Sequence, residues 1–359
     1  MAKLIQPRVY VPGRTLRVVL VVALLLVWAG VRERRNRGQV VWTQTGEAFG
    51  STYTVKVFPA PAPGDREGIA KGLEAVLQEV DDAVSTYRDD SELARFNENA
   101  TTNAVPVGPI LGRLLGVAQE VARSSGGAFD ITCGPLLEVW RFDDTASDLK
   151  APDDARLAEA RERSGHARLH FDGKTLRKEH PRMELNVNAI APGMAADLLR
   201  EWLAGRGMTN VYVEVGGETL ATGSKARGAP WRVGIQRPEL DAPVGGRPER
   251  IVELRNRALA TSGDYRNYRR DASGHVVSHI FDPRKGRPMV SDWASVSVLA
   301  PTCAEADAWA TALFVLGPEE GLALLPQSAP RVDAMFLVRT DGAFKVLQTP
   351  GFTAEKPEE

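Results

Sequence analysis

Cysteine is scarce in this chain of 359 residues, which contains only Cys133 and Cys303. Two cysteines so far apart form neither a disulfide framework nor the four-ligand set of a structural zinc site. Charge of one sign is also lacking, because the formal net charge is −1. With no excess positive charge to attract it, nucleic acid is not an expected partner. The composition is otherwise ordinary for a globular protein, with 43% hydrophobic and 25% charged residues.

Several common catalytic signatures are missing as well. The sequence has no G-x-G-x-x-G turn after a strand, no G-x-x-x-x-G-K-[ST] loop and no G-x-S-x-G elbow. These absences argue against a Rossmann cofactor site, a P-loop kinase and an α/β-hydrolase. His275 and His279 stand four residues apart, but the valines between them and Pro283 beyond indicate an extended segment. No third ligand stands nearby, so zinc is not expected.

One long hydrophobic run is present near the N-terminus. Residues 18–31 contain no charged or strongly polar side chain, and arginines flank the run on both sides. Its length lies between that of a signal-peptide core and the roughly 20 residues that span a membrane. No A-x-A cleavage site follows it. We therefore expect residues 1–39 to form an uncleaved signal anchor and a charged tether, with the body of the chain exported.

The body of the chain, residues 40–352, is predicted to form one α+β unit. Helices and antiparallel hairpins alternate irregularly, which favours a mixed or antiparallel sheet with flanking helices over a doubly wound parallel sheet. Residues 240–250 are expected to be a surface insertion, and 353–359 a disordered tail. Apolar spacing and turn residues predict helices over 69–84, 110–121, 194–203 and 303–316, strands over 53–58, 211–215 and 294–300, and hairpin turns at 172–173 and 341–342.

The segment 301–311 has the clearest chemical pattern. Thr302 is followed three residues later by Glu305, a capping box that predicts a helix start. Asp307 and Thr311 then lie one turn apart, so both oxygens project from one face of the helix. A carboxylate and a hydroxyl at this spacing suit a hard cation such as Mg²⁺. Taken alone, the pair is more often a solvated carboxylate and a hydroxyl bonded to its own helix.

The segment 184–197 is predicted to run from extended chain into a helix. Leu185, Val187 and Ala189 alternate with polar residues, and Pro192 suits the first helical position. A helix start offers free backbone N–H groups, which makes it a natural place for phosphate. On its own, the pattern is more common in a plain strand-to-helix connection.

Two other regions combine polar groups with aromatic or titratable side chains. After the polar stretch 260–265, His279 stands three residues before Asp282 and is a candidate general base, because histidine titrates near neutrality. Alone, such a histidine is more often a satisfied turn or core residue. Tyr87 and Phe129 stand beside polar groups, as a stacked ring ligand needs, and glycines near Phe129 permit close backbone approach.

Together, and in this order, these segments resemble the ApbE family of FAD:protein FMN transferases. Nearly all of the body takes part in the resemblance, which gives the order of the segments its weight. The matching stretches are Phe49-Gly50-Ser51, STYRDDSELARFN, GGAFDITCGPLLEVW, NAIAPGMAAD, VYVEVGGETLATG, WRVGIQRPE, ATSGDYRNY, SHIFDPRKGRPM and AEADAWATALFVLG.

The resemblance implies a specific activity. Family members bind FAD and Mg²⁺, transfer FMN through a phosphoester bond to a Thr or Ser hydroxyl of a target protein, and release AMP. Their targets are typically subunits of membrane redox complexes. With the expected anchor, the resemblance implies a protein of the bacterial inner membrane whose catalytic domain lies on the periplasmic side.

The resemblance also implies roles for individual residues. A Mg²⁺ ion would be held by the carbonyl of Ala189 together with Asp307 and Thr311. His279 would activate the attacking hydroxyl, with Asp282 as its orienting partner. The residues implied to contact FAD are Phe49, Tyr87, Ala128, Phe129, Asp130, Asn186, Pro192 and Ile280.

The sequence departs from the family pattern at three positions. Pro192 stands where many members have lysine or another polar residue, Asn186 where aspartate is usual, and Ala310 where some members have a further acidic ligand. Two alternatives to the transferase therefore stay open. One is an FAD pyrophosphatase that yields FMN and AMP, and the other is a non-catalytic membrane flavin-binding protein.

Overall fold

The computed structural model describes residues 40–141, 149–240, 245–265, 268–270 and 276–357. The predicted anchor at 18–31 lies outside these residues, as does His275, so both interpretations stay predictions. Among the described helices, only α8 (Cys303–Ser328) is long and apolar enough to cross a membrane. Of its apolar 18-residue stretch, 61% is buried inside the protein. That burial is typical of a central core helix.

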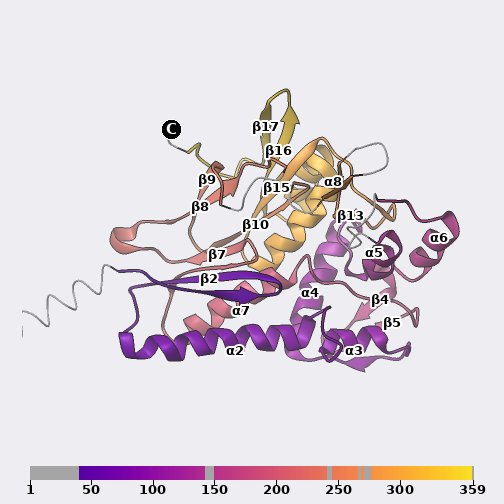
Figure 1. The fold of residues 1–359 in the computed structure, drawn as a ribbon, viewed down its shortest axis with the longest axis horizontal. Helices are drawn as coiled ribbons and strands as arrows, with labels where there is room; N and C mark the ends of the chain where they lie inside the picture. Colours follow the sequence, from indigo (N-terminus) through magenta and orange to yellow (C-terminus); the bar gives the residue numbers. More distant parts are fainter. Residues whose placement is uncertain (1–39, 142–148, 241–244, 266–267, 271–275, 358–359) are drawn as a thin grey trace, which may run out of the picture.

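An eight-stranded sheet forms the centre of the molecule (Figure 1). All of its described strand pairings are antiparallel, which confirms the antiparallel form of the expected α+β core. The strands, in their order across the sheet, are β1 (Trp42–Ala48), β2 (Ser51–Phe58), β6 (Asn210–Val215), β7 (Glu218–Thr222), β10 (Arg257–Gly263), β15 (Trp293–Ala300), β16 (Asp333–Thr340) and β17 (Ala343–Gln348).

Helices cover one face of this sheet, and a two-stranded hairpin covers the other. The larger apolar core lies between the sheet and the helices, and a smaller one lies under the hairpin β8 (Trp231–Gln236) and β9 (Pro248–Leu254), opposite α2 in Figure 1. The other helices are α2 (Arg66–Val84), α3 (Glu92–Glu98), α4 (Pro109–Ser124), α5 (Gly134–Trp140), α6 (Asp154–Glu162) and α7 (Ala191–Ala204).

Three small sheets and four short 3₁₀ turns complete the described fold. β3 (Val105–Pro106), β5 (Thr175–Lys178) and β4 (Leu169–Phe171) form one sheet, β11 (Tyr268–Arg270) pairs with β12 (Val276–Ser278), and β13 (Phe281–Asp282) pairs with β14 (Arg287–Pro288). The turns are η1 (Pro63–Asp65), η2 (Ile131–Cys133), η3 (His166–Arg168) and η4 (Ala226–Gly228). The predicted hairpins at 172–173 and 341–342 are confirmed as the β4–β5 and β16–β17 turns.

One sequence interpretation needs correction, and two other predicted segments are now described in more detail. The predicted insertion 240–250 is wrong in its last part, because Pro248 begins β9 and pairs with Gln236. Leu185 and Val187 are buried in the expected alternation, but the segment 183–187 pairs with no described strand. The tail predicted at 353–359 stays a prediction; within it, Glu355 exchanges two 2.8 Å backbone hydrogen bonds with Ile251 of β9.

The helix predicted over 303–316 is confirmed, and its continuation was not expected. Gly317 has a φ of +82°, a value that favours glycine, and Pro318 follows it. These two residues divide α8 into two parts, the first of which ends where the sequence predicted. Thr302 caps the helix as expected, because its side chain accepts a hydrogen bond from the Glu305 amide at 3.3 Å.

The starts of α7 and α8 lie in close contact. A Cβ atom added to Gly193 would stand 2.5 Å from the Cys303 carbonyl oxygen, so only glycine fits there. The fully buried Asp197 of α7 accepts hydrogen bonds from the Cys303 and Ala304 amides at 2.9 and 3.0 Å. Burial raises the pKa of Asp197, and these two bonds lower it by less. α7 thus supplies a second cap for α8.

Replacing Gly193 with alanine tests this close contact. We expect Gly193→Ala to lower the free energy of unfolding by about 1–3 kcal/mol, because backbone must move to admit the methyl group. The matched control is Gly116→Ala on α4, where an added Cβ has no neighbour within 4 Å. Alanine at that exposed helical position should stabilise by about 0.5–1 kcal/mol. Denaturant unfolding measures the free energy of unfolding of both variants. Equal changes in Gly193→Ala and Gly116→Ala would contradict the close contact between α7 and α8.

Candidate active site

The predicted pair Asp307 and Thr311 lies where α8, α7 and β10 meet. The Asp307 carboxylate is buried, and its Oδ2 accepts a hydrogen bond from the Gly193 amide at 3.2 Å. The Thr311 hydroxyl lies 3.3 Å from the hydroxyl of Ser262, near the end of β10. Ala189 stands in the turn that enters α7, four residues before Gly193. The polar stretch 260–265 and the segments around 189 and 307 therefore converge on one place.

The chemistry of these oxygens fits a hard cation. Burial raises the pKa of Asp307 to about 7, and the bond from Gly193 lowers it by less. A positive ion at the carboxylate would favour its ionised form. Among the described residues no group of three or more His, Cys, Asp or Glu side chains could hold a metal. A cation at Asp307 and Thr311 would take its other ligands from carbonyls, water or phosphate, as Mg²⁺ commonly does.

The start of α7 does not offer free N–H groups, contrary to the sequence prediction. Pro192 has no N–H, the Ala191 amide donates to the Val187 carbonyl at 2.9 Å, and the Gly193 amide donates to Asp307. The first three positions of α7 are therefore occupied within the protein or lack a donor. A phosphate near this helix start would depend on a cation for most of its charge compensation.

The segment 183–190 connects this place with the other predicted clusters. The Asn97 side chain accepts from the Leu185 amide at 2.8 Å and donates to its carbonyl at 2.9 Å. The Asn186 amide donates to the Ile131 carbonyl at 2.7 Å. These bonds satisfy the backbone of an extended segment that pairs with no described strand.

A cavity of about 510 Å³ opens along this segment. The Thr86 hydroxyl contacts the Asn188 side chain at 3.2 Å on one side of it. On another side Gly134 approaches so closely that an added Cβ would stand 2.8 Å from the Glu184 carbonyl oxygen. The lining residues are Thr86, Asn97, Gly134, Leu137, Glu138, Arg141, Glu184, Leu185 and Asn186.

The residues predicted at 128–130 are buried beside this cavity. Ala128 and Phe129 are 1% and 2% exposed, so the Phe129 ring belongs to the core and is not free to stack on a ligand in this structure. Asp130 accepts bonds from the Thr132 amide and hydroxyl and from the His166 amide, at 2.7–2.8 Å. Burial raises the pKa of Asp130, and these bonds lower it by less. Asp130 therefore shapes the loop that follows Phe129.

His279 and Ile280 directly precede the β13–β14 hairpin, and Asp282 lies in it. The buried Asp282 carboxylate accepts from the Arg284 Nε at 3.0 Å and from the Lys285 Nζ at 3.2 Å. Burial raises the pKa of Asp282, but these bonds outweigh it and leave the pKa below its ordinary value. These bonds all lie within the hairpin. The predicted role of Asp282 in orienting the partly buried His279 stays a prediction.

Helix α5 holds this hairpin beside the cavity. The Trp140 Nε1 donates to the Gly286 carbonyl at 2.9 Å, and its ring packs edge-on against Phe281 with centroids 6.1 Å apart. Three other residues of α5 line the cavity itself, namely Gly134, Leu137 and Glu138, and so does Arg141, directly after the helix. Helix α5 therefore contacts the hairpin through Trp140 and lines the cavity with other residues.

The remaining predicted FAD contacts occupy different surroundings. Tyr87 is 83% exposed, next to the Thr86 side of the cavity. Pro192 lies close to Gly216, in the β6–β7 turn, and the Gly216 amide donates to the Thr52 carbonyl at 3.0 Å. Phe49, with a φ of +54°, lies in the neighbouring β1–β2 turn. The β1–β2 turn, which bears Phe49, and the β6–β7 turn, which lies against Pro192 of α7, are therefore at one end of the sheet.

Sequence reasoning missed several residues that hold the site together. Asp197 was visible as an acid on an apolar helix face, but its partner lies more than 100 residues away. Ser262 is part of the motif ATSGDYRNY, but the sequence assigns it no role. The bond between Arg284 and Asp282 depends on the β13–β14 hairpin, which the sequence did not predict. Only Asp197 gave a sequence signal that could have been read.

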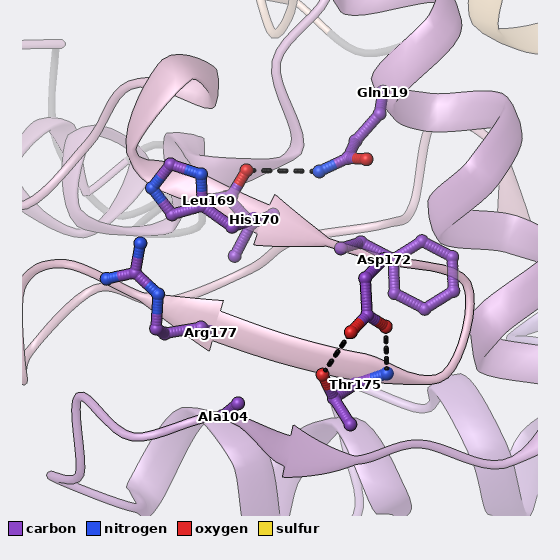
Figure 2. A pocket seen from close by; sticks show the side chains of 8 residues that line it. Ala104, Gln119, Leu169, His170, Asp172, Thr175 and Arg177 are labelled. Atoms are coloured by element: carbon purple, nitrogen blue, oxygen red, sulfur yellow. Dashed lines mark hydrogen bonds between the residues drawn. The ribbon is translucent and has the colours of Figure 1, made fainter.

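A second hollow, of about 360 Å³, lies away from these residues on the β3–β5–β4 sheet (Figure 2). Gln119 donates to the Leu169 carbonyl at 3.0 Å, and Asp172 accepts from the Thr175 amide at 2.7 Å. None of the predicted site residues lines it. Its polar groups serve the local hairpin, so we do not assign it to the active site.

Comparisons with known proteins agree on one family. The ApbE family profile matches residues 49–336. An FAD:protein FMN transferase of Vibrio cholerae is 35% identical over 337 residues, covering 93% of this chain and 97% of the relative. One from Haemophilus influenzae is 31% identical over 341 residues, covering 93% and 96%.

Solved structures show the same likeness. The flavin transferase ApbE from Vibrio cholerae superposes with a TM-score of 0.77 at 34% identity, covering 87% of this chain and 98% of its own. The apo form of the Pseudomonas stutzeri flavinyl transferase ApbE gives a TM-score of 0.75 at 36% identity, with 87% and 95% covered.

The raised pKa of Asp307 predicts a pH dependence of stability. Between its ordinary value of 3.8 and about 7, the folded protein keeps a proton that the unfolded chain has lost. This stabilisation is complete below about pH 4 and is lost as the pH rises through about 7. Asp307→Asn removes the titration, so the metal-free variant should melt several degrees above the wild type at about pH 8, and close to it at about pH 4.

Thermal melts at both pH values, with chelator present, measure this difference. Asp341→Asn, in the exposed β16–β17 turn, is the matched control and should follow the wild type throughout. A pH-independent difference between the wild type and Asp307→Asn would show that the buried carboxylate does not titrate in this range.

Proposed function

The chain belongs to the ApbE family, and from this premise we propose that it transfers the FMN part of FAD to another protein. The observation that carries the proposal is the convergence of Asp307, Thr311 and the start of α7, joined by the segment 183–190 to an open cavity. A volume of about 510 Å³ is in the usual range for ligand sites, roughly 300–1,000 Å³. The cavity would receive part of FAD, with the diphosphate directed toward Asp307.

The proposed reaction is a phosphoryl-type transfer to a Thr or Ser hydroxyl. The hydroxyl oxygen forms a bond to the phosphorus on the FMN side of the diphosphate, and the bond from that phosphorus to the bridging oxygen breaks. AMP leaves with that oxygen. A ring nitrogen of His279 accepts the hydroxyl proton, since the hydroxyl is a weak nucleophile without a base.

The residues that would hold Mg²⁺ are Asp307, Thr311 and the carbonyl of Ala189. When bound there, the ion would neutralise the charge that develops on the diphosphate. The occupied N–H groups at the start of α7 support this assignment, because they leave the phosphate few donors from that helix. The neutral Asn186 and Pro192 add no charge to this balance.

The open side of the site is where the acceptor protein would enter. Tyr87 is almost fully exposed and Val290, after β14, is 65% exposed, so apolar groups are available beside the cavity and the hairpin. We propose a subunit of a membrane redox complex as acceptor. The hydrophobic run 18–31 supports attachment to the bacterial inner membrane with the enzyme on the periplasmic side.

Transfer can be tested by weighing the acceptor. The protein is incubated with FAD, Mg²⁺ and a candidate flavoprotein subunit, and both proteins are measured by mass spectrometry. We expect an FMN-sized addition on the subunit that is lost with chelator and in Asp307→Ala, but kept in the exposed control Asp341→Ala. AMP release without any addition would indicate FAD hydrolysis, and FAD binding without AMP release would indicate a non-catalytic flavin-binding protein.

Replacing His279 tests its role as base. We expect His279→Ala to lower kcat by about 10²-fold or more, the usual contribution of a positioned base, while the affinity for FAD changes little. Steady-state AMP release and flavin fluorescence titration measure the two quantities. Ser291→Ala, after the same hairpin, is a control that should keep the wild-type kcat. An unchanged kcat in His279→Ala would assign the proton to another group.

A further inference from the structure

Lys178 is a buried lysine that no step of the proposed reaction uses. It ends strand β5 and is 1% exposed. Its Nζ donates to the carbonyls of Phe96 and Asn97 at 3.1 Å and of Met183 at 3.0 Å, and stands 4.9 Å from the Phe96 ring centre. Three N–H donors meet three acceptors, which is the full capacity of an ammonium group.

Burying the charged ammonium group of Lys178 costs free energy, so we ask what this side chain does that an uncharged one could not. Burial lowers the pKa of Lys178, and the nearby Glu184 raises it by less. An apolar side chain of similar volume would avoid the cost of burying a charge, but it would leave the three carbonyls without a donor. What an apolar residue cannot do is join the end of α3, at Phe96 and Asn97, to Met183.

The two backbone segments that Lys178 joins build one wall of the cavity. The Asn97 side chain bonds both the amide and the carbonyl of Leu185, which stands two residues after Met183. Asn97, Leu185 and Asn186 all line the 510 Å³ cavity. The ammonium group therefore bonds to Asn97 directly and to Met183, two residues before Leu185, and it does not line the cavity itself.

We propose that Lys178 is a positioning residue for the flavin site, which holds the wall of Asn97, Leu185 and Asn186 in the shape that FAD binding requires. This inference rests on the proposed function, because it takes FAD as the occupant of the cavity. It assigns Lys178 to affinity for FAD and not to the chemical step.

The neighbouring residues of the same hairpin supply a matched control. Thr175 and Arg177 lie on the outer face of β5 and line the second hollow (Figure 2), whereas Leu176 and Lys178 point inward. Lys174, in the exposed β4–β5 turn, carries the same side chain in solvent. Lys174→Met is thus the same chemical change without the buried bonds.

The test compares Lys178→Met and Lys178→Gln with the wild type and Lys174→Met. We expect the KM for FAD to rise about tenfold or more in Lys178→Met, the size of losing one charge-assisted hydrogen bond, with kcat within about twofold. Lys178→Gln keeps two N–H donors and should give a smaller rise. In the FAD-free protein, amide hydrogen exchange over 183–187 should accelerate in the same order, and Lys174→Met should match the wild type.

A merely structural lysine would give a different pattern. Methionine packs better than glutamine among apolar groups, so an effect on packing alone would make Lys178→Gln the more damaged variant. An unchanged KM in either folded variant, or a KM rise that is larger in Lys178→Gln than in Lys178→Met, overturns the proposal. If Lys178→Met does not fold, Lys178→Gln decides by the same split between KM and kcat.

Failure of the proposed function is recognised separately. Wild type and Lys174→Met that bind FAD but release no AMP would refute the transferase, while FAD affinity and hydrogen exchange still decide the role of Lys178. Normal turnover in all four proteins, with unchanged KM, would refute only the role of Lys178.

Discussion

Two buried carboxylates hold the starts of α7 and α8 together, and each belongs to the opposite helix. Asp197 of α7 accepts from the first amides of α8, and Asp307 of α8 accepts from the Gly193 amide of α7. Because a helix start has unpaired N–H groups and partial positive charge, each acid stabilises the other helix. This reciprocal capping requires a glycine at 193, where a Cβ would strike the backbone of α8.

The reciprocal capping determines which polar groups remain available for chemistry where α7 and α8 meet. It consumes the amides that a phosphate would otherwise use, and it leaves one buried carboxylate beside two hydroxyls. The segment 183–190 runs from there to the cavity, held by Asn97 and Ile131 on its way. A flavin pocket and a cation site therefore share one short stretch of backbone, so a shift of this stretch would change both.

Sequence patterns predicted the parts of this account that depend on local spacing. The capping residue Thr302, the one-turn separation of Asp307 and Thr311 and the two Asp-Gly hairpins follow from residues near each other in the chain. The alternation at Leu185 and Val187 is also confirmed by the burial of both side chains, but the segment pairs with no described strand. Its backbone is satisfied by an asparagine side chain 88 residues earlier, which no local pattern reveals.

Other tertiary features were equally invisible in the sequence. Free N–H groups at the start of α7 were a fair expectation until Asp307, 114 residues away, was found bonded to one of them. The Phe129 ring could be assigned to a ligand as readily as to the core, because sequence does not show which surface an aromatic residue covers. The order of the motifs identified the family, and the tertiary contacts showed how the motifs support one another.

The most direct test of the central claim uses Mn²⁺ in place of Mg²⁺, since both ions favour oxygen ligands in octahedral geometry. The ³¹P relaxation of FAD bound to the protein would be measured with and without Mn²⁺. Our account predicts strong relaxation of both phosphorus nuclei in the wild type and its loss in Asp307→Asn. Equally strong relaxation in that variant would place the cation elsewhere and contradict the account.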